Sequence, residues 1–273
     1  MNPSIPAGRV AFYISPDDHE IHYSVVKVRG RYVDEYDVLE LPRGEPDDFY
    51  VNRNLAPTDP NYRVVVERSK EHNTLKRLGI EDAGDPLAIL AAHGYAYERT
   101  ESLEEAGKRE LKEEHGFDDG AHLDMVRQLI TMRPFPVKAN YGSPVEYRSF
   151  VQIEGDVSSI ALAKTDKVEK KSPKRLGAPY TEAGGWATLR EIRQNAADFA
   201  ALAEADESPE QARLRGEAAY QKSITDWMET AEAALVATLR RQRVEVQTTS
   251  IVDPAKALQT TDAAVSSGAE LFR

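Results

Sequence analysis

Residues 101–117 read ESLEEAGKRELKEEHGF, and this stretch predicts a helix with a recognisable signal at each end. Ser102 is suited to be the N-cap. Glu105, three positions later, completes a capping box that satisfies backbone N–H groups of the first turn. Gly116 stands where a left-handed C-cap is expected. We therefore expect a helix over residues 102–115.

The acidic residues of this predicted helix lie on an unexpected face. At about 100° per residue, the apolar face is centred on Leu103, and Glu110 and Glu114 fall inside it while Glu113 lies at its edge. Inward-facing carboxylates repel each other, and their desolvation costs several kcal/mol of folding free energy unless a cation offsets their charge. Carboxylate oxygens suit Mg²⁺ or Mn²⁺. The pattern therefore predicts a divalent-cation site on this helix.

A charged surface helix is the alternative interpretation of the same residues. Glu104 with Lys108, and Glu105 with Arg109, have the i,i+4 spacing of ordinary exposed ion pairs. This interpretation accounts for those four residues. It accounts less well for the inward-facing carboxylates, so the helical wheel alone leaves both interpretations open.

The same stretch resembles the signature of the Nudix hydrolase family. That signature runs Gly, five residues, Glu, seven residues, then Arg-Glu-apolar-any-Glu-Glu-any-Gly-apolar. Every specified position after the first is matched, by Glu101 and by residues 109–117. Each fixed residue type occurs at roughly 5–10%, so a match of this length is very rarely accidental. Tyr95 occupies the place of the leading glycine, and Gly94 precedes it by one position.

The resemblance implies an α+β fold, a Nudix-like α/β/α sandwich with a mixed sheet, in which the signature forms a loop–helix–loop. It implies that Glu110, Glu113 and Glu114 bind Mg²⁺ or Mn²⁺, and that Arg109 pairs with Glu101 to hold the loop against the helix. Family members hydrolyse a nucleoside diphosphate linked to another moiety. We therefore expect Glu101, Arg109, Glu110 and Glu114 to be catalytic and a nucleotide diphosphate derivative to be the small-molecule partner.

The general base stays open, because in this family it comes from the signature or from a distant loop. Four residues are alternative candidates: Glu110, Glu146, Glu169 and Glu182. We expect none of His93, His115 and His122 to be catalytic, because their spacing is not that of metal ligands.

The substrate is less constrained than the reaction. Pro134 lies 17 positions after Phe117 and is similar to a proline that marks the ADP-ribose-cleaving branch of the family. A proline-rich turn between strands is the simpler interpretation. Tyr95, Tyr97 and Phe135 have rings that can stack on a nucleobase, although packing in a core is the commoner fate of such rings.

The composition of the chain excludes several classes of protein and of active site. The chain has 273 residues, no cysteine and a formal net charge of −11. Absence of cysteine excludes disulfide scaffolds, thiolate metal sites and a thiol nucleophile. The acidic excess argues against a nucleic-acid partner. No apolar segment is long enough to span a membrane, and the N-terminus lacks a signal-peptide pattern, so we expect a cytoplasmic protein.

The first third of the chain is rich in β-branched and aromatic residues, so we expect strands there. Residues 9–15 and 20–28 flank a Pro-Asp-Asp turn and predict a hairpin, and residues 31–41 predict a third strand. Residues 42–61, with four prolines, are expected to form a loop. Further strands are predicted at 62–67, 126–132 and 146–153, and a strand-to-helix junction is predicted at 186–193. A short apolar run over 87–92 ends at His93-Gly94. The lysine-rich stretch 164–174 is interpreted as a solvated loop or, alternatively, as a basic flap over a phosphate group.

The C-terminal part changes character. Residues 195–243 are rich in alanine, and Ser208-Pro209 is a strong helix start. An apolar stripe then recurs every three or four residues, at Tyr220, Ile224, Trp227, Met228, Ala231, Leu235 and Leu239. Such a stripe packs on its own domain or on a second subunit, and with the N-terminal hairpin it suggests a homodimer. We expect a catalytic domain over 1–195, a helical extension over 196–243 and a flexible tail over 244–273.

Two functional hypotheses follow from the sequence. The first is a metal-dependent pyrophosphohydrolase. The second is a non-catalytic nucleotide-sensing or scaffold module that retains the same fold, which Tyr95 and the long C-terminal helix favour. The complete set of signature glutamates favours the enzyme, because a site without catalysis has no reason to keep buried like charges.

Overall fold

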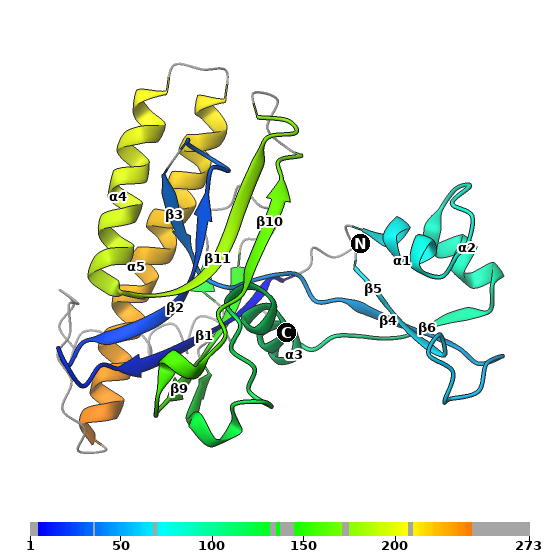
Figure 1. Cartoon of the computed structure of the whole chain (residues 1–273), viewed down its shortest axis with the longest axis horizontal. Coiled ribbons are helices and arrows are strands. Elements are labelled where there is room, and N and C mark those ends of the chain that lie inside the picture. Colours follow the sequence, from blue (N-terminus) through cyan, green and yellow to red (C-terminus); the bar gives the residue numbers. More distant parts are fainter. Residues whose placement is uncertain are drawn as a thin grey trace, which may run out of the picture.

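The computed structural model describes residues 5–34, 36–67, 70–131, 135–136, 145–170, 175–206 and 210–241. These residues form a mixed α+β structure around an eight-stranded sheet (Figure 1). Its strands are β1 (Ala7–Ile14), β2 (Ile21–Arg29), β3 (Asp37–Glu40), β7 (Val126–Thr131), β8 (Phe135–Pro136), β9 (Val145–Ile153), β10 (Lys164–Val168) and β11 (Pro179–Thr188). The predicted mixed sheet is confirmed, because β1 runs parallel to β9 and antiparallel to β2.

The N-terminal hairpin lies at the centre of this sheet. The strands follow the order β10-β11-β2-β1-β9-β7, with β3 paired to β2 and β8 to β9. The hairpin prediction is therefore confirmed, and both of its strands have a neighbour on each side. Of the third predicted strand only Asp37–Glu40 is extended, because a left-handed Gly30 and a run of bends precede it.

Helices cover both faces of the sheet. Val10 and Phe12 of β1 pack in one buried cluster with α5 (Gln211–Arg241), while Ala11 packs on the opposite side with Leu111 and Phe117. The alternating side chains of one strand thus serve two layers. Two helices complete the layers: α3 (Leu103–Glu110), on the Leu111 side, and α4 (Leu189–Ala205), on the α5 side.

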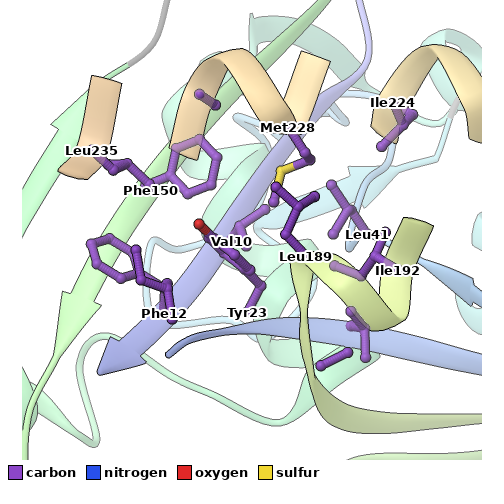
Figure 2. Close-up of a cluster of buried hydrophobic side chains, with 14 of the residues drawn as sticks. Val10, Phe12, Tyr23, Leu41, Phe150, Leu189, Ile192, Ile224, Met228 and Leu235 are labelled. Atoms are coloured by element: carbon purple, nitrogen blue, oxygen red, sulfur yellow. The ribbon is translucent and has the colours of Figure 1, made fainter. Parts of the chain in front are cut away.

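The apolar stripe of α5 packs on this chain's own sheet. Figure 2 shows Met228 and Leu235 of α5 pointing toward Val10, Phe12 and Phe150 of the sheet. The sequence left two packing partners open for this stripe, its own domain or a second subunit. In the structure the stripe packs on its own domain. Both the stripe and the hairpin are packed within this chain. They therefore no longer support a homodimer, which stays a prediction. The start of the helix at Ser208-Pro209 and the tail over 244–273 lie outside the described residues.

A small lobe is inserted between β3 and α3, and the sequence did not predict it. Its elements are β4 (Asp48–Asn52), β5 (Arg63–Val66), α1 (Glu71–Arg77), α2 (Pro86–Ala92) and β6 (Tyr95–Thr100). The three strands form a separate sheet in the order β5-β4-β6. Its core is a cluster that includes Val66, Leu75, Leu90 and Tyr95. In Figure 1 the lobe lies to one side of the main sheet.

The expectation of a loop over residues 42–61 is therefore wrong in its middle. β4 lies within it and pairs with both β5 and β6, so long-range pairing overrides the local turn signals of the prolines around it. The other described elements are two short 3₁₀ turns, Leu123–Met125 and Val157–Ser159, and a π-helical turn described below. Among the described residues, no helix has the length and apolarity that a membrane crossing requires.

Met228→Ala tests whether α5 belongs to the central core. Met228 is fully buried against the sheet, and emptying such a site costs about 2–5 kcal/mol of the free energy of unfolding. Lys222→Ala on the same helix is the control, because Lys222 is exposed and its loss is expected to cost less than about 0.5 kcal/mol. Urea unfolding measures both. Equal costs for the two variants would contradict the packing of α5 on the sheet.

Candidate functional site

The helix predicted from residues 102–115 is present, with one difference. Ser102 accepts from the backbone N–H of Glu105, and the Glu105 carboxylate accepts from that of Ser102, which completes the capping box. After Glu110 the helix widens into a π-helical turn over Leu111–His115 that ends at Gly116 in the left-handed region, with φ of 103°. Such turns are rare and frequently occur at functional sites. Here the turn carries Glu113 and Glu114.

Arg109 joins the helix to the loop before it, as the resemblance implies. Its Nη2 donates to Glu101 Oε2 at 3.0 Å and to the Glu45 carbonyl at 3.0 Å. Glu101 is buried and also accepts from the backbone N–H of Asp47 at 3.1 Å. The pair therefore fastens three segments together: the helix, the strand end at Glu101 and the segment around Asp47.

Glu110 is buried beneath the backbone of Gly44. A Cβ at residue 44 would overlap the Glu110 carboxylate, so any residue other than glycine requires that carboxylate or the local backbone to move. Gly44 is held in place by two backbone hydrogen bonds with Ala7, at 2.8 and 3.0 Å. The Glu110 carboxylate accepts from Arg109 Nη1 at 2.5 Å.

Glu114 and Glu113 differ in exposure. Glu114 is half-buried and accepts from the backbone N–H of Arg43 at 3.0 Å. Glu113 is exposed and lies 3.4 Å from Arg109 Nη1. The helical wheel placed Glu114 inside the apolar arc and Glu113 at its edge, and the structure has the same order of burial.

These residues line a cleft of about 410 Å³ between the signature helix, the inserted lobe and the edge strand β10. Its described ionisable lining consists of seven acidic residues, Glu45, Asp47, Glu67, Glu110, Glu113, Glu114 and Glu182, and three basic residues, Lys70, Arg109 and Lys167. The acids exceed the bases by four, so the cleft attracts cations and repels a bare anion.

The pKa values of the buried acids follow from this excess of negative charge. Burial raises the pKa of Glu110, with Glu113 and Asp47 adding repulsion and Arg109 opposing the shift. Burial also raises the pKa of Glu114 well above its usual range, with repulsion from Glu110 and Glu182. An added cation would let these carboxylates stay ionised together.

The donor set suits a hard divalent cation, because carboxylate oxygens dominate the lining of the cleft. In the described part of the chain, however, no three His, Asp or Glu side chains already converge as metal ligands. Arg109 lies against Glu110 and Glu113, and Glu114 is turned toward Arg43. Metal binding at this place therefore requires side-chain rotation, which the exposed Glu113 permits.

The four candidate bases are placed differently. Glu110 and Glu182 line the cleft. Glu146 is buried away from the described lining, between Arg43 and Arg148, and these two guanidinium groups lower its pKa against the effect of burial. Glu169 is also buried and outside that lining. Geometry thus favours Glu110 and Glu182.

The three aromatic residues that the sequence offered for stacking on a nucleobase are Tyr95, Tyr97 and Phe135. Tyr95 is buried in the core of the lobe, and its hydroxyl donates to the Asn61 carbonyl at 3.0 Å. Tyr97 is exposed. The side chain of Phe135 and all of Pro134 lie outside the described residues.

The three histidines do not line the cleft in the described residues. His115 is fully buried, its Nε2 lies 3.1 Å from the Gly185 carbonyl, and burial lowers its pKa to about 4. His122 stacks on Phe117. His93 is exposed at the end of α2.

Sequence reasoning missed the contribution of the lobe and of residues 43–47. Gly44 and Asp47 lie in the segment expected to be a loop, and Glu67 and Lys70 lie in the unpredicted lobe. No local pattern indicates that these residues reach the signature helix. The first part of the lysine-rich stretch 164–174 forms β10, so the expectation of a solvated loop is wrong there, and Thr165 and Lys167 of this strand line the cleft.

Asp47→Asn is expected to stabilise the metal-free protein at pH 7.5 but not at pH 4. Burial, with repulsion from Glu101, raises the pKa of Asp47 from 3.8 to about 6 despite Arg109. A raised folded-state pKa means that wild type loses stability as pH rises from about 4 to about 6. We expect a gain of about 1–2 kcal/mol, less than the full shift because the cleft admits water.

Urea unfolding of both proteins in EDTA at the two pH values measures this difference. A variant that is destabilised equally at both pH values would contradict the placement of Asp47 among like charges.

The sequence matches no protein-family model and no curated protein.

Proposed function

We propose that this protein is a metal-dependent hydrolase of the Nudix type that cleaves the pyrophosphate link of a nucleoside diphosphate derivative. The observation that carries the proposal is the cleft in which Glu110, Glu113 and Glu114 are gathered with an uncompensated excess of acidic groups. A substrate with a diphosphate brings still more negative charge into this acidic cleft. Bound cations are therefore needed to offset the repulsion between the substrate and the carboxylates.

In this proposal Glu110, Glu113 and Glu114 hold Mg²⁺ or Mn²⁺. When bound, the cation neutralises oxygens of the diphosphate and favours ionisation of a water molecule. Lys70 of the lobe and Lys167 of β10 both line the cleft, and in this proposal they contact phosphate oxygens. Arg109, fastened to Glu101, keeps the helix in register with the loop.

The reaction breaks the bridging P–O bond and forms a new P–O bond to the oxygen of water. Glu182 is our preferred acceptor for the proton of that water, because it lines the cleft together with the signature carboxylates. Glu110 is the alternative acceptor. The leaving phosphate takes the negative charge of the broken bridge, so atoms and charge balance.

A panel of substrates tests the proposal. The purified protein is incubated with Mg²⁺ or Mn²⁺ and with ADP-ribose, dinucleotides, nucleoside diphosphate sugars and nucleoside triphosphates, and the products are separated by chromatography. We expect cleavage of at least one compound at its pyrophosphate link. Cleavage of none would remove the proposal.

A nucleotide-sensing module is the second candidate, and Tyr95 in the place of the signature glycine favours it. Tyr95 is committed to the core of the lobe, so the loop before the helix differs from that of the family pattern. A sensor predicts that a nucleotide raises the melting temperature without being consumed. The panel separates the two candidates when thermal shift and product formation are measured on the same samples.

A further inference from the structure

Two residues of the segment 42–44, Arg43 and Gly44, contact the signature carboxylates Glu114 and Glu110. The backbone N–H of Arg43 donates to Glu114 at 3.0 Å, and the backbone of Gly44 covers the carboxylate of Glu110. The placement of this segment therefore sets where both carboxylates lie.

Buried polar side chains in turn hold the segment 42–44 in place. The Pro42 carbonyl accepts from Arg148 Nη1 at 2.8 Å. The Arg43 guanidinium donates to Glu146 Oε1 at 2.9 Å. It also lies over the ring of Tyr220, 4.2 Å from the centroid, as a cation–π contact.

Tyr220 of α5 completes this arrangement. Its hydroxyl donates to the same Glu146 oxygen at 2.7 Å, and Tyr220 and Glu146 are each only 3% exposed. A buried carboxylate between charged donors holds its geometry well while every partner is present. Loss of one partner leaves the others to rearrange.

We propose that Tyr220 is a positioning residue for the signature carboxylates, acting through Glu146 and Arg43. This inference rests on the proposed function and gives the C-terminal helix a part in it. The chain of contacts runs from the hydroxyl of Tyr220 to Glu146, from Glu146 to the Arg43 side chain, and from the Arg43 backbone to Glu114. No residue of α5 belongs to the signature.

Tyr220→Phe tests the inference with little disturbance, because the ring and its contact with Arg43 are kept and only the hydroxyl is lost. Tyr23→Phe is the matched control. The hydroxyl of Tyr23 donates to Glu232 of the same helix at 2.9 Å, and Tyr23 is fully buried. Tyr23 has no described contact with residues 42–44, so its loss changes the α5–sheet contact without reaching the signature carboxylates.

The two variants and wild type are compared by Mn²⁺ affinity, from electron paramagnetic resonance, and by the rate of hydrolysis of the best substrate. We expect Tyr220→Phe to weaken Mn²⁺ binding by about ten-fold, the lower end of what loss of a supporting contact costs a metal site. The hydrolysis rate should fall in parallel. Tyr23→Phe should match wild type in both measurements, and thermal melting shows that both variants are folded.

The outcomes are distinguishable. If wild type binds Mn²⁺ and Tyr220→Phe binds it equally well, the inference fails and the proposed function stands. Equal weakening in Tyr23→Phe also overturns the inference, because the effect would then come from loosening of α5. If wild type does not bind Mn²⁺ at all, the proposed function fails and the inference fails with it.

Discussion

Glu114→Gln is expected to lower the rate of hydrolysis by about 100- to 1000-fold, the usual loss when one group that stabilises developing charge is removed. The substitution keeps size and hydrogen-bond acceptance from Arg43. It removes one negative charge from the proposed cation site. Initial rates at saturating Mg²⁺ on the best substrate of the panel measure the effect.

Glu104→Gln is the control for this variant. Glu104 lies on the same helix, and its substitution removes the same charge, but its side chain is about half exposed and pairs with Lys108 and with Arg9. The rate of this variant is expected to stay within about two-fold of wild type, because Glu104 is not among the described residues that line the cleft and an ion pair of a half-exposed carboxylate contributes little. A Glu114→Gln protein that is as fast as wild type would exclude Glu114 from catalysis.

Gly44→Ala is expected to produce a loss of about 100-fold in the hydrolysis rate, again in the range of a removed stabilising group. The added methyl group would overlap the Glu110 carboxylate, so either that carboxylate or the backbone of residues 43–44 must move. Because Gly44 pairs with Ala7 at the start of β1, we expect Glu110 to be displaced and Mn²⁺ affinity to fall with the rate.

Gly84→Ala makes the same chemical change where a Cβ meets nothing within 4 Å. It is expected to leave the rate unchanged and to change stability by less than about 1 kcal/mol. Full activity in Gly44→Ala would show that Glu110 does not act from its present position.

The sequence predicts the signature helix well because its determinants are local. The capping box at Ser102 and the left-handed cap at Gly116 are both present. The π-helical turn over Leu111–His115 was not predicted, because the helical wheel assumes a constant rotation per residue. The order of burial of the acidic residues survives this error because the turn is short.

The rest of the site depends on pairing between distant segments. β4 forms only because β5 and β6 lie beside it, and Gly44 reaches Glu110 only because it pairs with Ala7. Neither relation leaves a periodic or motif signal. The stripe on α5 was predicted, but its partner was not, because apolar periodicity does not tell one apolar surface from another.

The most direct test of the central claim is hydrolysis in ¹⁸O-labelled water. With Mg²⁺ present, we expect one of the two products to carry one solvent oxygen bound to phosphorus, and we expect EDTA to abolish the formation of both products. Product formation that is independent of metal, or a solvent oxygen bound to carbon and none to phosphorus, would contradict cleavage of a pyrophosphate at the acidic cleft.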